Sequence, residues 1–180
     1  MLIDKSNTIL LIIDVQEKLF KKIINKKKLE KNSGVLIKTF KLLNLPIFIT
    51  EQYPEGLGKT IKTLSDLFTN EVRFEKSSFS CAHDAQFKKV LKKQKRKQIL
   101  LLGIETHVCV LQSAFDLQYE GYIPYVITDA VSSRNMEDHE SALTRLITNN
   151  INILTTEMVV FELLKNFKHP KFREISKLIK

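Results

Sequence analysis

The stretch "QILLLGIETHVCVLQSAFDLQYEG" (98–121) decides the fold. Its first part, "QILLLG" (98–103), is a short apolar run that ends in glycine, which is typical of a fully buried β-strand. Its last part, "VCVLQSAFDLQYEG" (108–121), indicates a buried helix that closes at Gly121, because glycine is favoured just past a helix C-terminus. A buried strand that leads into a helix is typical of a βαβ unit in a parallel sheet.

The same alternation of apolar runs and helical segments continues toward both ends of the chain. It predicts an α/β fold, with one doubly wound, mostly parallel sheet, helices on both faces and a single domain over residues 1–180. The basic tail (168–180) is expected to form a short helix that packs on this domain or on a neighbouring subunit. The predicted strands are 8–14, 45–50, 98–103, 122–130 and 151–156, and the predicted helices are 35–43, 83–93, 108–121, 136–149 and 157–167.

Length and composition indicate a globular protein. The chain has 180 residues, 43% of them hydrophobic and 27% charged, which suits one domain with a sizeable core. The start "MLIDKSNTILLIID" (1–14) has no basic region before its apolar run, so it indicates a first strand and not a signal peptide. No apolar run approaches the roughly 18 residues that cross a membrane. Two cysteines make no disulfide framework, so we expect a reducing compartment, a cytoplasmic location and no membrane partner.

The formal charge of +9 comes largely from two lysine clusters, "KKIINKKK" (21–28) and "KKVLKKQKRK" (88–97). A basic patch can attract nucleic acid or anionic substrates. No aromatic or arginine-rich pattern is interleaved with these lysines, which favours solvated helix faces. Nucleic acid is therefore not the expected partner.

Polar residues gather where the predicted strands end, which is where an open parallel sheet binds its ligands. Asp14 ends the first strand, "TEQ" (50–52) follows the second, and Asp129 ends the strand that begins at 122. The loop "IETH" (104–107) leads to Cys109 at the start of a helix. These positions predict a site at one edge of the sheet.

Cys109 is a candidate nucleophile. Free N–H groups and the dipole of a helix N-terminus lower the pKa of a thiol, and the same N–H groups can receive an oxyanion. A nucleophile also needs a base and a positive neighbour. Asp14 is the candidate for taking the thiol proton, and Lys76 in "RFEKSSFS" (73–80) is the candidate for stabilising the thiolate.

Each of the three residues also has an ordinary structural interpretation. A cysteine in an apolar helix is usually inert core, and an aspartate at a strand end often caps a loop. Lys76 lies between segments that are predicted to be helical, where a lysine is usually solvated. Spacing alone leaves both interpretations of the triad open.

Five motifs together resemble the isochorismatase-like cysteine hydrolases, in an order and spacing that fit nearly the whole chain. The forms around residues 50–58 and 103–109 are most similar to the isochorismatase domain-containing proteins of that family. The motifs are "LLIIDVQEKLF" (10–20), "TEQYPEGLG" (50–58), "FEKSSFS" (74–80), "LLGIETHVCV" (101–110) and "TDAVSSR" (128–134).

The resemblance implies a parallel α/β fold and a triad of Asp14, Lys76 and Cys109. Members typically hydrolyse C–N bonds of small amides or related compounds through a covalent cysteine intermediate, whereas isochorismatases cleave a vinyl ether. The family has a cis peptide before the cysteine, which matches Ile104–Glu105 here. That turn orients the backbone N–H groups of Val108 and Cys109 as an oxyanion hole. Homo-oligomers are common among the relatives, so we expect a dimer or larger.

The chain departs from the family pattern at the metal site. Nicotinamidases of this family hold a metal with an aspartate and histidines after the second strand, and "TEQYPEG" (50–56) contains no histidine. We therefore expect no catalytic metal, no cofactor and no nicotinamidase activity. The residues expected to shape a substrate pocket are Gln16, Glu51, Gln52, Tyr53 and Phe79.

Other polar groupings have ordinary explanations. His107 lies two residues before Cys109, and such positions point to nearly opposite sides of a helix, so it is expected to be structural beside Thr106 as a possible N-cap. "HD" (83–84) and "DHE" (138–140) lie at predicted helix starts, where acidic residues are common, so neither is interpreted as a metal site.

Two further features leave alternatives. Cys81 lies five residues after Lys76, and we expect a small buried residue, although a regulatory disulfide with Cys109 is an alternative. Arg134 either binds an anionic group or braces the loop together with Asp129.

The favoured hypothesis is a cofactor-independent cysteine hydrolase that acts on a small molecule. One alternative is a nucleic-acid or anionic-partner binding protein on a hydrolase-like scaffold, motivated by the charge of +9. Another is an enzyme-like scaffold without turnover. The presence of all three triad residues argues against that last alternative.

Overall fold

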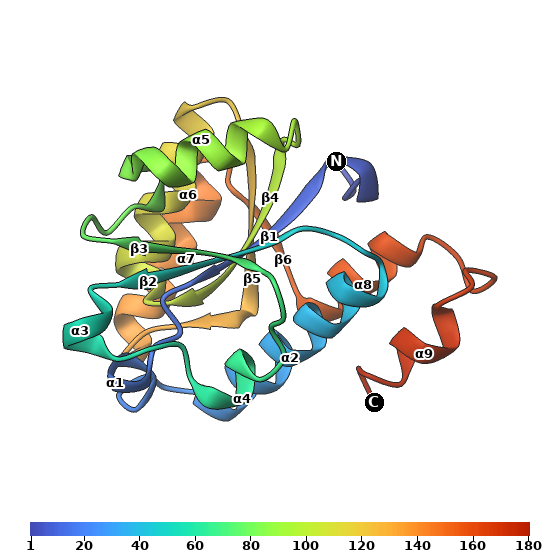
Figure 1. The fold of residues 1–180 in the computed structure, drawn as a ribbon, viewed down its shortest axis with the longest axis horizontal. Helices are drawn as coiled ribbons and strands as arrows, with labels where there is room; N and C mark the ends of the chain where they lie inside the picture. Colours follow the sequence, from blue (N-terminus) through green and yellow to red (C-terminus); the bar gives the residue numbers. More distant parts are fainter.

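A six-stranded parallel sheet forms the centre of the molecule, as the computed structural model of residues 1–180 shows (Figure 1). The strand order is β3-β2-β1-β4-β5-β6, and every neighbouring pair is parallel. The predicted α/β, single-domain fold class is confirmed. The strands are β1 (Thr8–Ile13), β2 (Ile47–Gln52), β3 (Val72–Lys76), β4 (Gln98–Ile104), β5 (Ile123–Ser132) and β6 (Asn152–Leu154).

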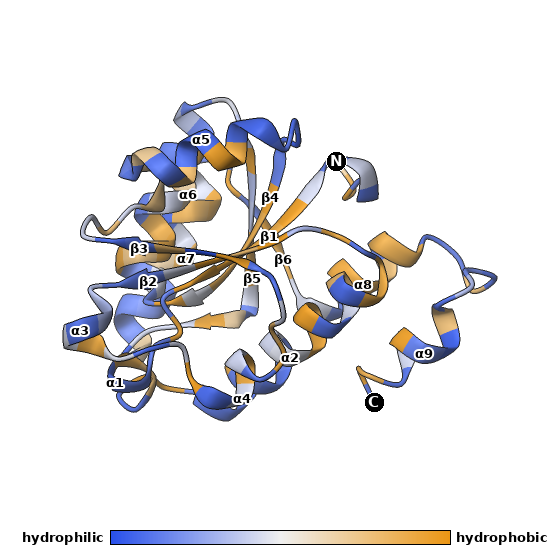
Figure 2. Cartoon of the chain, viewed as in Figure 1, coloured by the Kyte–Doolittle hydropathy of each residue, from blue (hydrophilic) through white to orange (hydrophobic).

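The two central strands are buried on both faces, which explains their continuous apolar sequences. Successive side chains of a strand point to opposite faces, so β1 sends Leu10 and Ile12 into one core and Leu11 and Ile13 into the other. Figure 2 shows the resulting apolar centre between more polar outer helices.

Helices cover both faces of this doubly wound sheet (Figure 1). The core that contains Leu10 includes α2 (Lys26–Leu42) and α8 (Thr156–Leu164). The other core, containing Leu11, includes α5 (Ala85–Lys93), α6 (Leu111–Tyr119) and α7 (Met136–Thr148). The short helices are α1 (Glu17–Phe20), α3 (Pro54–Leu57), α4 (Lys62–Ser65) and α9 (Phe172–Ser176).

The edge strand β3 was not predicted. It pairs only with β2, and its sequence "VRFEK" buries only Phe74 and Lys76. With so few apolar residues, the segment lacks the signal of a buried strand. Lys76 was expected between helices and is instead the last residue of this strand.

Two further differences concern β5 and the tail. β5 continues past Asp129 to Ser132, because a register shift against β4 lets the pairing resume at Gly103 and Val131. Of the two expected positions for the tail, the structure has it on the domain, where Ile175 of α9 is fully buried in the core beside α2 and α8.

Gly103 lets β1 and β4 run close together at their carboxyl ends. Its φ is +125°, in the region that favours glycine. A Cβ atom at this position would collide with the carbonyl oxygen of Ile13. Any larger residue would therefore push apart the two strands that precede Asp14 and the turn before Cys109.

Candidate active site

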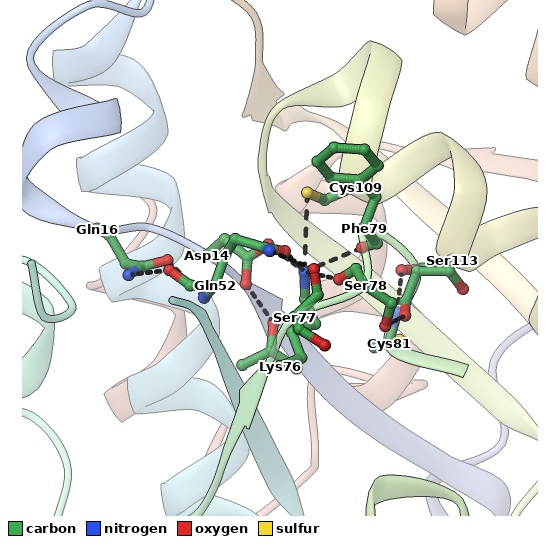
Figure 3. Close-up of polar contacts among 12 residues, drawn as sticks. Asp14, Gln16, Gln52, Lys76, Ser77, Ser78, Phe79, Cys81, Cys109 and Ser113 are labelled. Atoms are coloured by element: carbon green, nitrogen blue, oxygen red, sulfur yellow. Dashed lines mark hydrogen bonds and ion pairs between the residues drawn. The ribbon is translucent and has the colours of Figure 1, made fainter. Parts of the chain in front are cut away.

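Four strands deliver polar residues to one edge of the sheet (Figure 3). Asp14 follows β1, Gln52 ends β2, Lys76 ends β3, and Cys109 lies in the turn after β4. The register places Gln52 beside Lys76 and aligns the end of β1 with the ends of β2 and β4. The parallel sheet thus gathers residues that are far apart in sequence.

Asp14 and Lys76 form a buried ion pair. Lys76 Nζ lies 2.7 Å from Asp14 Oδ2, and the two side chains are only 1% and 0% exposed. The Thr50 hydroxyl donates a hydrogen bond of 2.8 Å to the other carboxylate oxygen. Thr50 was not assigned a role from the sequence, although its two-residue spacing from Gln52 puts both side chains on the same face of β2.

Lys76 also reaches the thiol and the loop that follows β3. Its Nζ lies 3.8 Å from Cys109 Sγ and donates to the Gln52 side-chain oxygen at 2.7 Å. It donates further to the carbonyl oxygens of Ser78 and Phe79, at 3.0 and 2.9 Å. The ammonium is therefore fixed between the carboxylate and the thiol (Figure 3).

The Cys109 thiol is protonated in the resting protein. Its pKa is raised to about 12, and burial is the largest cause; the Asp14 carboxylate also raises the pKa, by its charge and by accepting a hydrogen bond from the thiol. The Lys76 ammonium lowers the pKa of the thiol, but the net shift is still upward. The predicted lowering of the thiol pKa is therefore wrong, because desolvation of the thiolate outweighs the favourable charges.

The turn before Cys109 has an unusual backbone. The Ile104–Glu105 peptide bond is cis, and residues Thr106–Val110 form a π-helical turn that continues into α6. The Val108 N–H donates to the Glu105 carbonyl at 3.1 Å. Val108 was predicted to help form an oxyanion hole, but its only N–H is already engaged. Of the two predicted donors, we keep the Cys109 N–H as a proposal.

Three consecutive residues of this turn are bonded to the segment from Ser133 to His139. The Glu105 carboxylate accepts from Arg134 Nε, the Thr106 hydroxyl bonds His139 Nδ1, and His107 Nδ1 bonds the Ser133 hydroxyl, each at 2.9 Å. Burial lowers the pKa of His139. Ordered in this way, the turn holds Cys109 at a fixed place above the ion pair.

These bonds correct two expectations. Thr106 was expected to be the N-cap, but its hydroxyl is committed to His139, and the N-cap position is Glu105. Arg134 was expected either to bind an anion or to brace the loop with Asp129. It pairs with Glu105 instead, while Asp129 accepts from the N–H and hydroxyl of Thr156 at the start of α8, both at 2.8 Å.

Comparison with known proteins agrees with the family resemblance of the five sequence motifs. The family profile described as "Isochorismatase domain" matches residues 8–158. The chain belongs to the isochorismatase family. It is 36% identical to isochorismatase domain-containing protein 2A of Mus musculus over 174 residues, which cover 97% of this chain and 83% of that protein. It is 38% identical to isochorismatase family protein 1A of Dictyostelium discoideum, over 94% of this chain and 84% of that protein.

Solved structures show the same fold as this isochorismatase-family chain. MAR1 ribonuclease from Caenorhabditis elegans superposes with a TM-score of 0.94 and 36% identity, covering 99% of this chain and 92% of that chain. The YcaC gene product from Escherichia coli, described as an octameric hydrolase of unknown specificity, has a TM-score of 0.88 and 24% identity. The superposition covers 98% of this chain and 95% of the YcaC chain, and at this identity the similarity supports only the fold.

Two of the expected pocket residues hold loops of the isochorismatase fold. The Gln16 amide donates to the carbonyls of Gln52 and Gly58, at 3.0 and 2.6 Å, and accepts from the Gln52 N–H. The Glu51 carboxylate accepts from the N–H and hydroxyl of Thr60, at 2.7 and 2.6 Å. Glu51 lies on the strand face opposite Gln52, so we assign it to loop support and not to the pocket lining.

The other three expected pocket residues are more open to solvent. The Gln52 side chain bonds Lys76 and the Ser77 carbonyl. Tyr53 and Phe79 are exposed large side chains in the loops that follow β2 and β3. In Figure 3 the Phe79 ring projects to the same side as the Cys109 thiol. These residues are the candidates for contacting a substrate.

The remaining polar groupings are separate from the triad. Cys81 is free and fully buried, and burial raises its pKa to about 12. His83 pairs with Asp116 at 3.2 Å. No three side chains of His, Cys, Asp or Glu come together in a way that holds a metal ion. None of the helices has both the length and the apolar sequence that crossing a membrane requires.

Proposed function

We propose that this chain is a cofactor-independent cysteine hydrolase that cleaves an amide-type C–N bond of a small molecule. The observation that carries the proposal is the convergence of Asp14, Lys76 and Cys109, with Lys76 Nζ 2.7 Å from the carboxylate and 3.8 Å from the thiol. Membership of the isochorismatase family supports the same chemistry. Both cysteines are free, which supports the expected cytoplasmic location.

The first step forms a covalent intermediate. Asp14 accepts the proton of the Cys109 thiol as the sulfur attacks the substrate carbonyl carbon. The Cys109 N–H donates to the resulting oxyanion. Asp14 then gives its proton to the leaving amine, and a thioester remains on Cys109. Because the thiol is protonated at rest, proton transfer accompanies the attack and no stored thiolate is needed.

The second step releases the product. Asp14 takes a proton from water, and the hydroxide attacks the thioester carbonyl carbon. The carbon–sulfur bond breaks, the acid leaves, and the proton on Asp14 returns to Cys109. Lys76 keeps its charge throughout, so the buried site always holds a cation against the alternating negative charge of carboxylate, thiolate and oxyanion.

The pH dependence of alkylation by iodoacetamide tests this arrangement. We expect Cys109 to react slowly near neutral pH and to gain about tenfold per pH unit up to at least pH 10, because its pKa is raised to about 12 and only the thiolate reacts. Asp14→Asn removes a charge that raises the pKa, so it should speed alkylation while it abolishes hydrolysis. Rates at each cysteine are read by mass spectrometry of peptides.

Cys81 is the internal control, since it is fully buried and should stay unlabelled in the folded protein. A Cys109 profile that levels off near the reference pKa of about 8.5, and that Asp14→Asn leaves unchanged, contradicts a coupled triad. Binding or scaffold functions would then be favoured.

A second candidate function is RNA binding or cleavage. The worm relative with 36% identity carries the name ribonuclease, and this chain has a formal charge of +9. However, the cluster at 88–97 runs along α5 to the start of β4, at the opposite end of that strand from Cys109 and on the other face of the sheet from the cluster at 21–28. We therefore expect no continuous basic patch beside the triad.

Salt titration of binding to a single-stranded RNA decides between the two functions. We expect weak binding that disappears as salt rises, without cleavage. A steep dependence with affinity surviving near 150 mM salt indicates several true phosphate contacts. Together with RNA cleavage that Cys109→Ala abolishes, that result would replace the small-molecule proposal.

A further inference from the structure

The outer side of α8 is unusually apolar. Val159, Val160 and Leu163 are buried in the core, but Met158 and Phe161 on the other side remain 45% and 43% exposed. Figure 2 shows apolar residues along this helix. Large apolar side chains that lie together on an exposed helix face normally mark a contact surface, and this face has no partner in the single chain.

The exposed face borders a groove of about 1080 Å³ between α8 and the start of the chain. Leu2, which is exposed, forms part of the opposite wall. The bond from the Ile3 N–H to Glu162, 2.8 Å, holds that wall against the helix. None of the triad residues lines the groove, so it is a separate surface from the candidate active site.

Opposite charges flank the apolar face at equal distances. Glu157 lies four residues before Phe161, and Lys165 lies four residues after it. At 100° per residue, Glu157, Met158 and Phe161 fall within an arc of about 100° on one side of the helix, and Lys165, the first residue past the helix end, lines the same groove. The arrangement is therefore acid, apolar centre, base along a single stripe.

We propose that a second copy of this chain docks here, with the two α8 helices antiparallel about a two-fold axis near Phe161. A two-fold contact joins the same patch on both copies. Antiparallel packing places Glu157 of each copy opposite Lys165 of the other, and each Phe161 enters the groove beside Leu2. The result is an apolar centre with a charged rim, the usual anatomy of an interface.

The charge pattern favours a second copy over an unrelated partner. Reversal of the helix direction exchanges the positions of Glu157 and Lys165 about Phe161, so the stripe is complementary to itself. A parallel arrangement would instead place like charges side by side. This inference is independent of the proposed hydrolase activity.

Sedimentation velocity over a range of protein concentrations tests the docking surface. We expect the full chain to form a dimer and Phe161→Asp to be monomeric at the same concentrations. Ile147→Asp is the matched control, because Ile147 is an exposed apolar residue of α7 outside the groove, and it should leave the dimer intact. Circular dichroism verifies that both variants are folded.

A charge reversal tests the orientation. Glu157→Lys alone and Lys165→Glu alone should each weaken the dimer at least about tenfold, because each turns two attractive pairs into two repulsive ones. The double reversal should restore wild-type affinity. The proposal is overturned by a wild-type monomer at all concentrations, by a dimer that Phe161→Asp leaves intact, or by a double reversal that fails to restore affinity.

Discussion

Replacing Cys109 with alanine is expected to lower hydrolysis of a cognate amide by at least about a thousandfold. Losing a nucleophile removes the covalent route, and such losses are typically of this size or larger. The only other cysteine, Cys81, is fully buried in the core and cannot take over the reaction. Ammonia or amine release from a panel of small amides measures the loss, and intact-protein mass detects the acyl adduct on Cys109.

Cys81→Ala is the matched control for this experiment. Cys81 lies beside Ala82 and packs in the same apolar core, so a smaller side chain should leave turnover nearly unchanged. Retention of more than about a tenth of the activity in Cys109→Ala, or an adduct on any other residue, contradicts the assigned nucleophile.

Replacing Lys76 with methionine is expected to lower the free energy of unfolding by about 3–5 kcal/mol. The change leaves the Asp14 carboxylate fully buried without a cationic partner, with only the Thr50 hydroxyl and the Cys109 thiol as side-chain donors. Breaking a buried ion pair on one side costs this much because an uncompensated charge remains out of water. Urea denaturation followed by circular dichroism measures the change.

Two further variants make the measurement specific. Lys62→Met breaks the exposed pair between Lys62 and Asp66, whose side chains are 83% and 58% exposed, and should cost at most about 1 kcal/mol. The double variant Asp14→Asn, Lys76→Met removes both charges and should recover most of the stability. If Lys76→Met costs no more than Lys62→Met, the buried pair does not stabilise the carboxylate as described.

The sequence predicts the centre of the fold well and its edges less well. The central strands β1 and β4 carry unbroken apolar runs because both their faces are buried. Strand β3 was missed because an edge strand with exposed charges has too few apolar residues to be recognised. That omission matters for function, since β3 is the element that points Lys76 inward.

The candidate site shows a similar division. Asp14, Cys109 and Gln52 can be predicted as site residues, because ligands bind at the carboxyl ends of parallel strands. The role of Thr50 and the pairing of Glu105 with Arg134 depend on side-chain orientation, which spacing does not specify. The direction of the thiol pKa depends on how deeply Cys109 is buried, which also requires three-dimensional structure.

The arrangement of the strands has a consequence for how the protein acquires its reactivity. Lys76 on an edge strand meets Asp14 only after β2 is paired between β1 and β3, and Cys109 arrives only with β4 on the other side of β1. Parallel pairings between distant segments form late, because loop closure costs entropy before contacts repay it. Newly made or partly folded chains should therefore lack hydrolase activity although their thiols are exposed, and acylation of Cys109 by an amide substrate would be a probe for complete folding.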